Sequence, residues 1–141
     1  MNIQQMTEDI VPAQAAMFLK ELGFNVPCKA FFMGGQCYTL NSLSYNSLFE
    51  NKPEQFSAPT IQTALKWLRN EKNVFIEVRT EDSKFKYKIK IRTQNKWSTY
   101  WDNLILFDTY EDAICDALIE FLLRLVYDER TNKTTDGGQP E

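Results

Sequence analysis

Alternating cations between residues 84 and 93 are the pattern in this sequence with the clearest chemical meaning. Every second residue is basic and the residues between are apolar or aromatic, since Lys84, Lys86, Lys88, Lys90 and Arg92 alternate with Phe85, Tyr87, Ile89 and Ile91. A β-strand sends alternate side chains to opposite faces, so the cations share one face. Such a face, extended by Arg79 from a neighbouring strand, could follow the phosphates of a nucleic acid. We favour the alternative of a solvated sheet face, where lysine also discourages edge-to-edge aggregation.

Two carboxylates near the start of the last predicted helix form a second candidate. Asp112 and Asp116 are one helical turn apart and share a face. They could act as an acid–base pair or bind a divalent cation. We favour a simpler role, in which both side chains solubilise the helix and complement the positive end of its dipole.

Nucleophilic and metal chemistry lack the residues they need. The sequence contains no histidine, which removes Ser–His and Cys–His pairs and His-ligated metals. The three cysteines, Cys28, Cys37 and Cys115, are too few for zinc held by four thiolates. Cys28 and Cys37 are expected roughly 13 Å apart along a hairpin, too far for a disulfide. We therefore predict a protein that is not an enzyme, with no cofactor, no metal site and cysteines in packing roles.

The three tryptophans are candidates for a binding surface. Trp67, Trp97 and Trp101 could line a groove for a partner. We favour burial in the core or at its rim, and a partly exposed cluster would mark an interface.

The first part of the chain predicts a helix followed by a β-hairpin. Pro12 suits the first helical position and Gly23 the C-cap of a helix over residues 12–22. Residues 28–40 predict a hairpin around Gly34-Gly35, because both central positions of a type I′ turn need positive φ. The expected pairs are Met33–Gln36, Phe32–Cys37 and Phe31–Tyr38.

The second part predicts a helix, two or three antiparallel strands and a final helix. Thr60 or Ser57 caps the first helix, which runs to about Lys72, and strands follow at residues 73–79, 84–93 and, irregularly, 97–107. A turn at Asp82-Ser83 would place both apolar sets of the first two strands on one face. The expected pairs are Val78–Tyr87, Ile76–Ile89 and Val74–Ile91, with Glu77 opposite Lys88. The last helix carries a broad core-facing stripe that includes Leu118.

Together these elements predict an α+β fold. The 141 residues, 43% of them hydrophobic, suffice for a packed core. We expect an N-terminal helix–hairpin unit in residues 1–41, a connector in 42–57 with a short helix near Leu48, the main unit in 58–127, and a disordered tail in 128–141. The two helix–hairpin units resemble each other at an offset of 49 residues, which leaves internal duplication open. No secretory signal or membrane span is recognised, so we expect a cytoplasmic protein without a membrane partner.

Three stretches, residues 19–28, 57–69 and 108–113, resemble small uncharacterised proteins of bacterial phages and prophages. The resemblance implies an accessory protein of a mobile element and carries no known activity or site. The element order of the main unit is similar to that of a double-stranded-RNA-binding domain. Those domains resemble one another in a lysine-rich start to the final helix, where this chain has Asp108, Glu111, Asp112 and Asp116, and acidic residues there repel phosphate.

A protein-interaction module is therefore the predicted function, with a protein partner or self-association. The alternative is a weak nucleic-acid binder that uses Arg79 and the basic face Lys84, Lys86, Lys88, Lys90 and Arg92.

Overall fold

The computed structural model describes residues 9–138 and confirms the predicted α+β class. Three α-helices and two antiparallel three-stranded sheets make up this part of the chain. In chain order the elements are α1 (Ala13–Glu21), β1 (Cys28–Met33), β2 (Gln36–Ser44), the 3₁₀ helix η2 (Asn46–Phe49), β3 (Gln55–Ser57), α2 (Ile61–Glu71), β4 (Val74–Glu81), β5 (Lys84–Thr93), β6 (Lys96–Asp102) and α3 (Tyr110–Gly138). The predicted N-terminal unit and tail also include residues 1–8 and 139–141, which lie outside the described residues.

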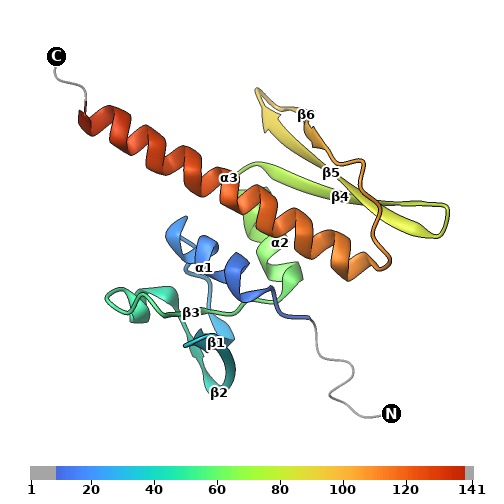
Figure 1. Ribbon diagram of the computed structural model, residues 1–141. Coiled ribbons are helices and arrows are strands. Elements are labelled where there is room, and N and C mark those ends of the chain that lie inside the picture. The colour runs from blue at the N-terminus through green and yellow to red at the C-terminus, as the bar shows by residue number, and fades with distance from the viewer. Residues whose placement is uncertain (1–8, 139–141) are drawn as a thin grey trace, which may run out of the picture.

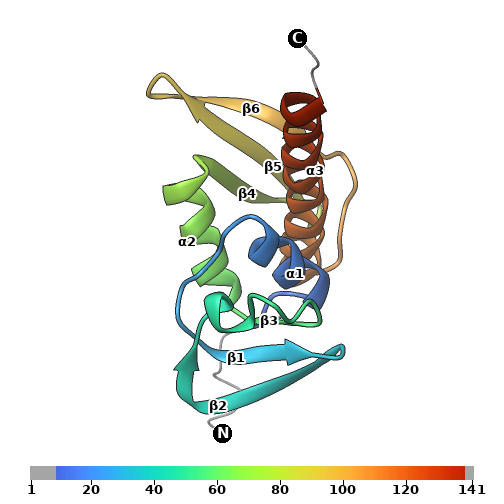
Figure 2. The same ribbon diagram turned by 90° about the vertical axis from the view of Figure 1, so that its left-hand side faces the viewer.

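The helices lie between the two sheets (Figures 1 and 2). One sheet has the strand order β2-β1-β3 and the other β4-β5-β6. Helix α3 packs on β4 and β5 and also on α1, while α2 packs on β4. The buried apolar side chains of both predicted units form one continuous cluster, so the same core holds both sheets in place.

Turn chemistry determines the register of both predicted hairpins. Gly34 and Gly35 have φ values of 58° and 84°, and Met33 pairs with Gln36 as predicted. At the second turn Asp82 and Ser83 also have positive φ. All four predicted pairs of β4 and β5 are confirmed, namely Val78–Tyr87, Ile76–Ile89, Val74–Ile91 and Glu77–Lys88.

The predicted connector is partly ordered into the first sheet, which corrects that boundary. Strand β2 continues to Ser44, η2 forms near Leu48 as expected, and β3 pairs with β1 through Phe32 and Phe56. Buried Asn46 explains this order, because its side-chain amide donates to Phe24 O at 2.7 Å and accepts from Ser57 N at 2.7 Å. These partners are distant in sequence and carry no local signal.

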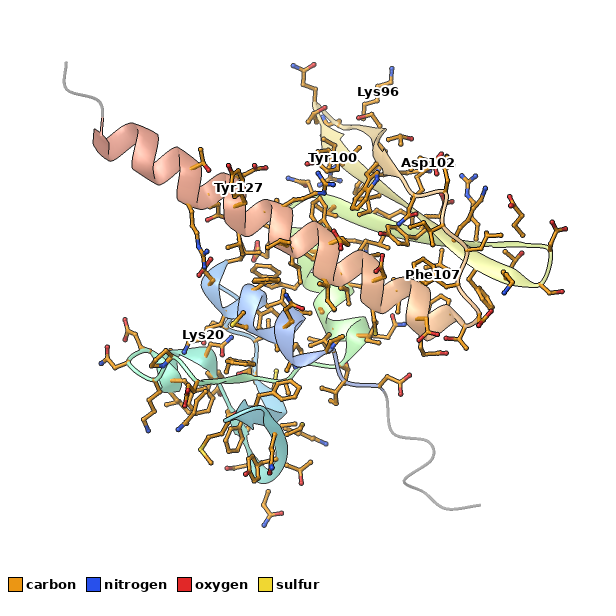
Figure 3. The ribbon with its side chains drawn as sticks, in the orientation of Figure 1. Lys20, Lys96, Tyr100, Asp102, Phe107 and Tyr127 are labelled. Atoms are coloured by element: carbon orange, nitrogen blue, oxygen red, sulfur yellow. The ribbon has the colours of Figure 1, made fainter. Side chains whose placement is uncertain are left out.

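Lys20 anchors the same segment to α1. Its Nζ donates to three backbone carbonyls, those of Phe49 (2.6 Å), Lys52 (3.0 Å) and Gln55 (2.9 Å), and the side chain reaches down from α1 in Figure 3. One ammonium group thereby satisfies several carbonyls of a turn that has no regular ladder.

The last helix is longer than predicted. Thr109 caps it by accepting a hydrogen bond from Asp112 N at 3.0 Å, but α3 then continues through Gly138 instead of ending at residue 127. Ion pairs with distant elements support the extension, since Glu129 lies 3.6 Å from Lys72 and Arg130 lies 2.6 Å from Glu21. Among residues 9–138 no helix is both long and apolar enough to cross a bilayer.

The order of the elements is the only feature of the structure that supports an internal duplication. Each of α1 and α2 is followed by an antiparallel hairpin. Their packing differs, because α2 lies on β4, the strand that follows it, whereas α1 lies against α3 and β3.

Candidate functional site

The predicted basic stripe exists on the outer face of the second sheet, opposite α3. The β4–β5 register brings Arg79 beside Lys86, and Lys84, Lys86, Lys88, Lys90 and Arg92 share that face. The structure therefore gathers every predicted site residue on one surface. It also places acidic side chains among them, because Glu77 and Glu81 of β4 and Asp102 of β6 face the same way.

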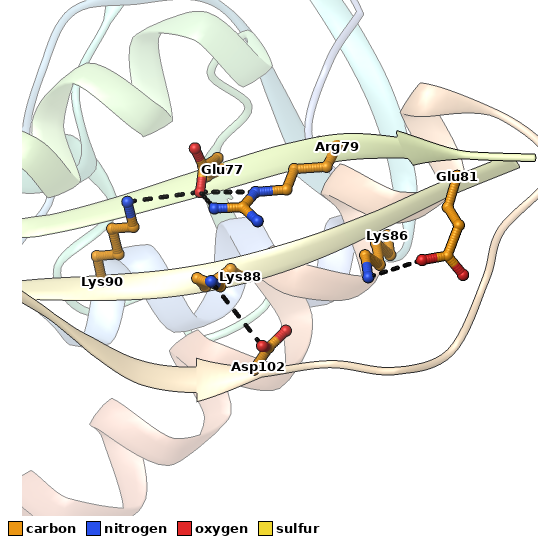
Figure 4. A network of polar contacts seen from close by, with 7 residues as sticks. All are labelled: Glu77, Arg79, Glu81, Lys86, Lys88, Lys90 and Asp102. Carbon is orange, nitrogen blue, oxygen red and sulfur yellow. Dashed lines mark hydrogen bonds and ion pairs between the residues drawn. The ribbon is translucent and has the colours of Figure 1, made fainter.

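Each cation of this surface has a partner, and Figure 4 shows those of Arg79, Lys86, Lys88 and Lys90. The lysines lie within ion-pair distance of carboxylates, which are Asp108 for Lys84 (2.5 Å), Glu81 for Lys86 (2.9 Å), Asp102 for Lys88 (3.9 Å) and Glu77 for Lys90 (3.5 Å). Arg79 Nη2 lies 2.9 Å from the same Glu77 oxygen. Arg92 donates to Asn73 Oδ1 at 2.9 Å and lies 5.6 Å from the centre of the Trp97 ring.

Glu77 is the centre of this network. Burial opposes its ionisation, but the hydrogen bond and charge of Arg79 and the charge of Lys90 outweigh burial and lower its pKa. Asp108 also has a lowered pKa, because Lys84 donates to it. The face therefore carries cations that are paired with carboxylates, and not a row of free cations. A phosphate backbone would have to displace these carboxylates before it met several positive charges.

Asp116 has a structural partner that the sequence reasoning missed. The hydroxyl of Tyr87, a side chain only 1% exposed, donates to Asp116 Oδ2 at 2.9 Å. Burial raises the pKa of Tyr87, and its contact with Asp116 raises it further. Treating Asp112 and Asp116 as equivalent exposed carboxylates was therefore wrong. The missed signal was Tyr87 itself, because a hydroxyl on the apolar face of a strand needs a buried partner.

Removing this partner should destabilise the fold more than removing its neighbour. Asp116→Ala leaves the Tyr87 hydroxyl without its acceptor, so the free energy of unfolding should fall by about 1–3 kcal/mol. Asp116→Asn keeps an acceptor oxygen and should cost less than about 1 kcal/mol. Urea unfolding measures both, with the exposed Asp112→Asn as the control. Equal losses for Asp116→Ala and Asp112→Asn would contradict the assigned role of Asp116.

The raised pKa of Tyr87 also predicts a pH effect. The folded state holds the phenol proton more tightly than the unfolded chain, so this stabilisation is complete below about pH 10 and is lost as pH rises toward the folded pKa. Tyr87→Phe should flatten the alkaline fall in stability. The measurement is the free energy of unfolding of both proteins as a function of pH. If it fell with the same slope at alkaline pH in the wild type and in Tyr87→Phe, the prediction would be contradicted.

The cysteines lie where thiolate chemistry is disfavoured. Cys28 is buried, Cys115 half-buried and Cys37 exposed, and all three are free thiols. Burial raises the pKa of Cys28 to about 11. Cys28 and Cys37 border an apolar hollow of about 450 Å³ between β1, β2 and the start of α2. In residues 9–138 no three acidic or cysteine side chains are grouped to hold a metal ion.

Of the three tryptophans, Trp97 has the most exposed side chain. Trp67 packs edge-on against Phe24. Trp101 lies beneath the guanidinium of Arg124, whose Cζ is 4.3 Å from the centre of the Trp101 ring. Trp97 is 40% exposed, and Tyr100 on the same strand is 44% exposed. Both belong to β6, the border strand of the second sheet, which within residues 9–138 pairs only with β5. Figure 3 shows Lys96, Tyr100 and Asp102 along this border.

Strand β6 is the least protected sheet edge in the described chain. Native edges are usually shielded by charge, bulges or shortness. Strand β4 carries Glu77, Arg79 and Glu81, and β3 is three residues long. Strand β2 is interrupted, because Thr39 pairs with Ala30 but Ser44 pairs with Cys28. Between Lys96 and Asp102, β6 has no charge, and its register breaks only beyond Thr99.

An apolar loop continues this edge. Leu104, Ile105 and Leu106 are 78%, 63% and 37% exposed. The loop is held by Asn103, whose Oδ1 accepts from Ile105 N at 2.7 Å, and by Phe107, which bridges to Phe85. Exposed apolar side chains that are held in a defined loop are typical of an interface.

Comparisons of the chain with family models, curated proteins and solved structures found no match.

Proposed function

We propose that this chain is a non-enzymatic protein-interaction module that binds an extended polypeptide strand at the free edge of β6. The observation that carries the proposal is the open edge itself, with an uncharged, partly exposed aromatic segment between Lys96 and Asp102. A strand that adds to such an edge gains backbone hydrogen bonds, and neighbouring side chains provide specificity. The apolar loop Leu104–Ile105–Leu106 extends the contact surface beyond the strand.

The backbone geometry of the β5–β6 hairpin supports strand addition. Gln94 and Asn95 have positive φ, and Thr93 pairs with Lys96, so these four residues form a two-residue β-turn hairpin. In such a turn Lys96 N–H points to β5, and the alternation of an antiparallel ladder then points the N–H and C=O of Trp97 and Thr99 away from the sheet. These groups are available to a partner strand.

The ion pairs of the outer face make nucleic acid the weaker alternative. Every predicted phosphate contact already has a partner side chain within this chain. A mobile-element origin and a cytoplasmic location, expected from the sequence, belong to the same proposal.

The test compares two substitutions at one position. Thr99→Pro removes an outward-pointing N–H without removing a bond to β5, whereas Thr99→Val keeps it. The tagged wild-type chain should retain proteins from a cell extract, and Thr99→Val should retain the same proteins. Thr99→Pro should lose them. Treatment of the extract with nuclease should not change the retention. Retention that ignores Thr99→Pro would contradict strand addition.

The nucleic-acid alternative has its own measurement. Fluorescence anisotropy with labelled duplex RNA, duplex DNA and single strands at physiological salt should show at most weak binding, with a Kd of ~10⁻⁴ to 10⁻⁶ M that weakens as salt rises. Submicromolar affinity that disappears in Lys86→Glu with Lys88→Glu would instead establish the basic face as the functional surface.

A further inference from the structure

The free edge of β6 is complementary to itself, and we propose that its occupant is a second copy of this chain, paired antiparallel about a two-fold axis at Ser98. The inference rests on the proposed strand addition and names its partner. The two β6 strands would join the three-stranded sheets of two copies into one continuous antiparallel sheet.

Backbone groups meet correctly only in certain registers, and the Ser98 register is one of them. A two-fold axis at Ser98 places Trp97 of one copy opposite Thr99 of the other, twice. Trp97 and Thr99 are the residues whose N–H and C=O point away from β5, so both pairs are hydrogen-bonded pairs. Ser98, whose own groups point to β5, then faces its equivalent in a non-hydrogen-bonded pair, as the alternation requires.

Side chains in this register also fall on matching faces of the joined sheet. Trp97 pairs with Arg92 and Thr99 with Lys90, so both point to the outer face. Lys96 pairs with Thr93 and Ser98 with Ile91, which puts them on the inner face. Tyr100 also lies there, since its ring contacts Phe121 of α3 at 5.6 Å. A two-fold axis shifted by one residue to Thr99 would oppose Trp97 with Trp101, which lies on the inner face beside Tyr87.

The contacts that result are favourable and avoid opposed like charges. The two Trp97 rings become diagonal neighbours across the axis, within reach of large aromatic side chains. Each ring already contacts Phe75 of its own copy at 6.1 Å, so an aromatic row would cross the interface. On the inner face Lys96 stands opposite Tyr100 of the other copy, a cation–aromatic pair that forms twice. The two Lys96 ammonium groups lie at opposite ends of the paired segment.

Light scattering after size exclusion, at increasing protein concentration, tests the proposal. The wild-type chain and Thr99→Val should approach twice the monomer mass of 16.5 kDa. Thr99→Pro removes two intermolecular donors per dimer and should raise the dimer dissociation constant about 30-fold or more. Its circular dichroism and melting temperature should show that the monomer remains folded. A wild-type chain that stays monomeric at every concentration overturns the proposal.

A cysteine cross-link tests the register. In a Cys37→Ser background, Ser98→Cys brings two thiols together across the axis at a Cα separation of about 4.5 Å, which suits a disulfide. Mild oxidation should therefore yield a covalent dimer of Ser98→Cys. Thr99→Cys should not form one, because Thr99 faces Trp97 of the other copy. Equal cross-linking of the two variants would overturn the Ser98 register.

The two levels of the proposal fail in different ways. A monomeric wild type whose captured proteins are lost with Thr99→Pro would overturn the dimer and leave strand addition supported. A monomeric wild type whose captured proteins are unaffected by Thr99→Pro would overturn both.

Discussion

Leu118→Ala should lower the free energy of unfolding by about 2–5 kcal/mol. The Leu118 side chain is fully buried in the N-terminal third of α3, the helix that packs on β4, β5 and α1. Truncation leaves a cavity between α3 and the elements packed on it, β4, β5 and α1. These elements cannot move in to fill the cavity, because each is held in place by its other contacts. Chemical denaturation monitored by circular dichroism measures the change.

Leu123→Ala is the matched control for this prediction. Leu123 lies on the same helix but is 44% exposed, so its truncation creates no cavity and should change stability by less than about 1 kcal/mol. If Leu118→Ala were as mild as Leu123→Ala, the assigned core face of α3 would be wrong.

Asn46→Ala should lower the free energy of unfolding by about 2–4 kcal/mol. The Asn46 side chain is 6% exposed and bridges two backbone groups, Phe24 O and Ser57 N. Alanine leaves both groups without a partner, and each buried unsatisfied group costs about 1–3 kcal/mol. Because Ser57 belongs to β3, amide hydrogen exchange should also accelerate across residues 55–57.

Two variants sharpen the result. Asn51→Ala removes an exposed asparagine from the same segment and should be nearly neutral. Asn46→Asp keeps an acceptor for Ser57 N but places a carboxylate against Phe24 O, so it should destabilise at neutral pH and recover in part as acid protonates the carboxyl. A neutral Asn46→Ala would show that water or backbone movement replaces both bonds.

Leu118 and Asn46 differ in how clearly the sequence shows their importance. The apolar stripe that contains Leu118 follows a helical period and was predicted as core. Asn46 lies in a segment rich in Asn and Ser, and the same composition predicted only a connector. Its role depends on Phe24, which precedes it in the sequence, and on Ser57, which follows it. Folding brings both residues to Asn46.

Local chemistry by itself determined the two hairpins and the helix starts. The turn residues Gly34-Gly35 and Asp82-Ser83 adopt positive φ, and the period of two then sets which side chains share a face. Thr60 and Thr109 cap their helices within three residues. All of these interactions lie close together in the chain, so a pattern of residue types carries them.

Only the tertiary structure decided which of the patterned residues are free to act. The alternation of residues 84–92 places the cations on one face of the sheet, but their carboxylate partners Asp102 and Asp108 come from segments after β5. Asp116 could be identified as the acceptor for Tyr87 only once α3 lay across the sheet. The open edge of β6 likewise depends on strand order, because a strand's sequence does not say whether it has one neighbour or two. Pairing between distant segments depends on loop closure and on packing of the whole core, and no local periodicity encodes either.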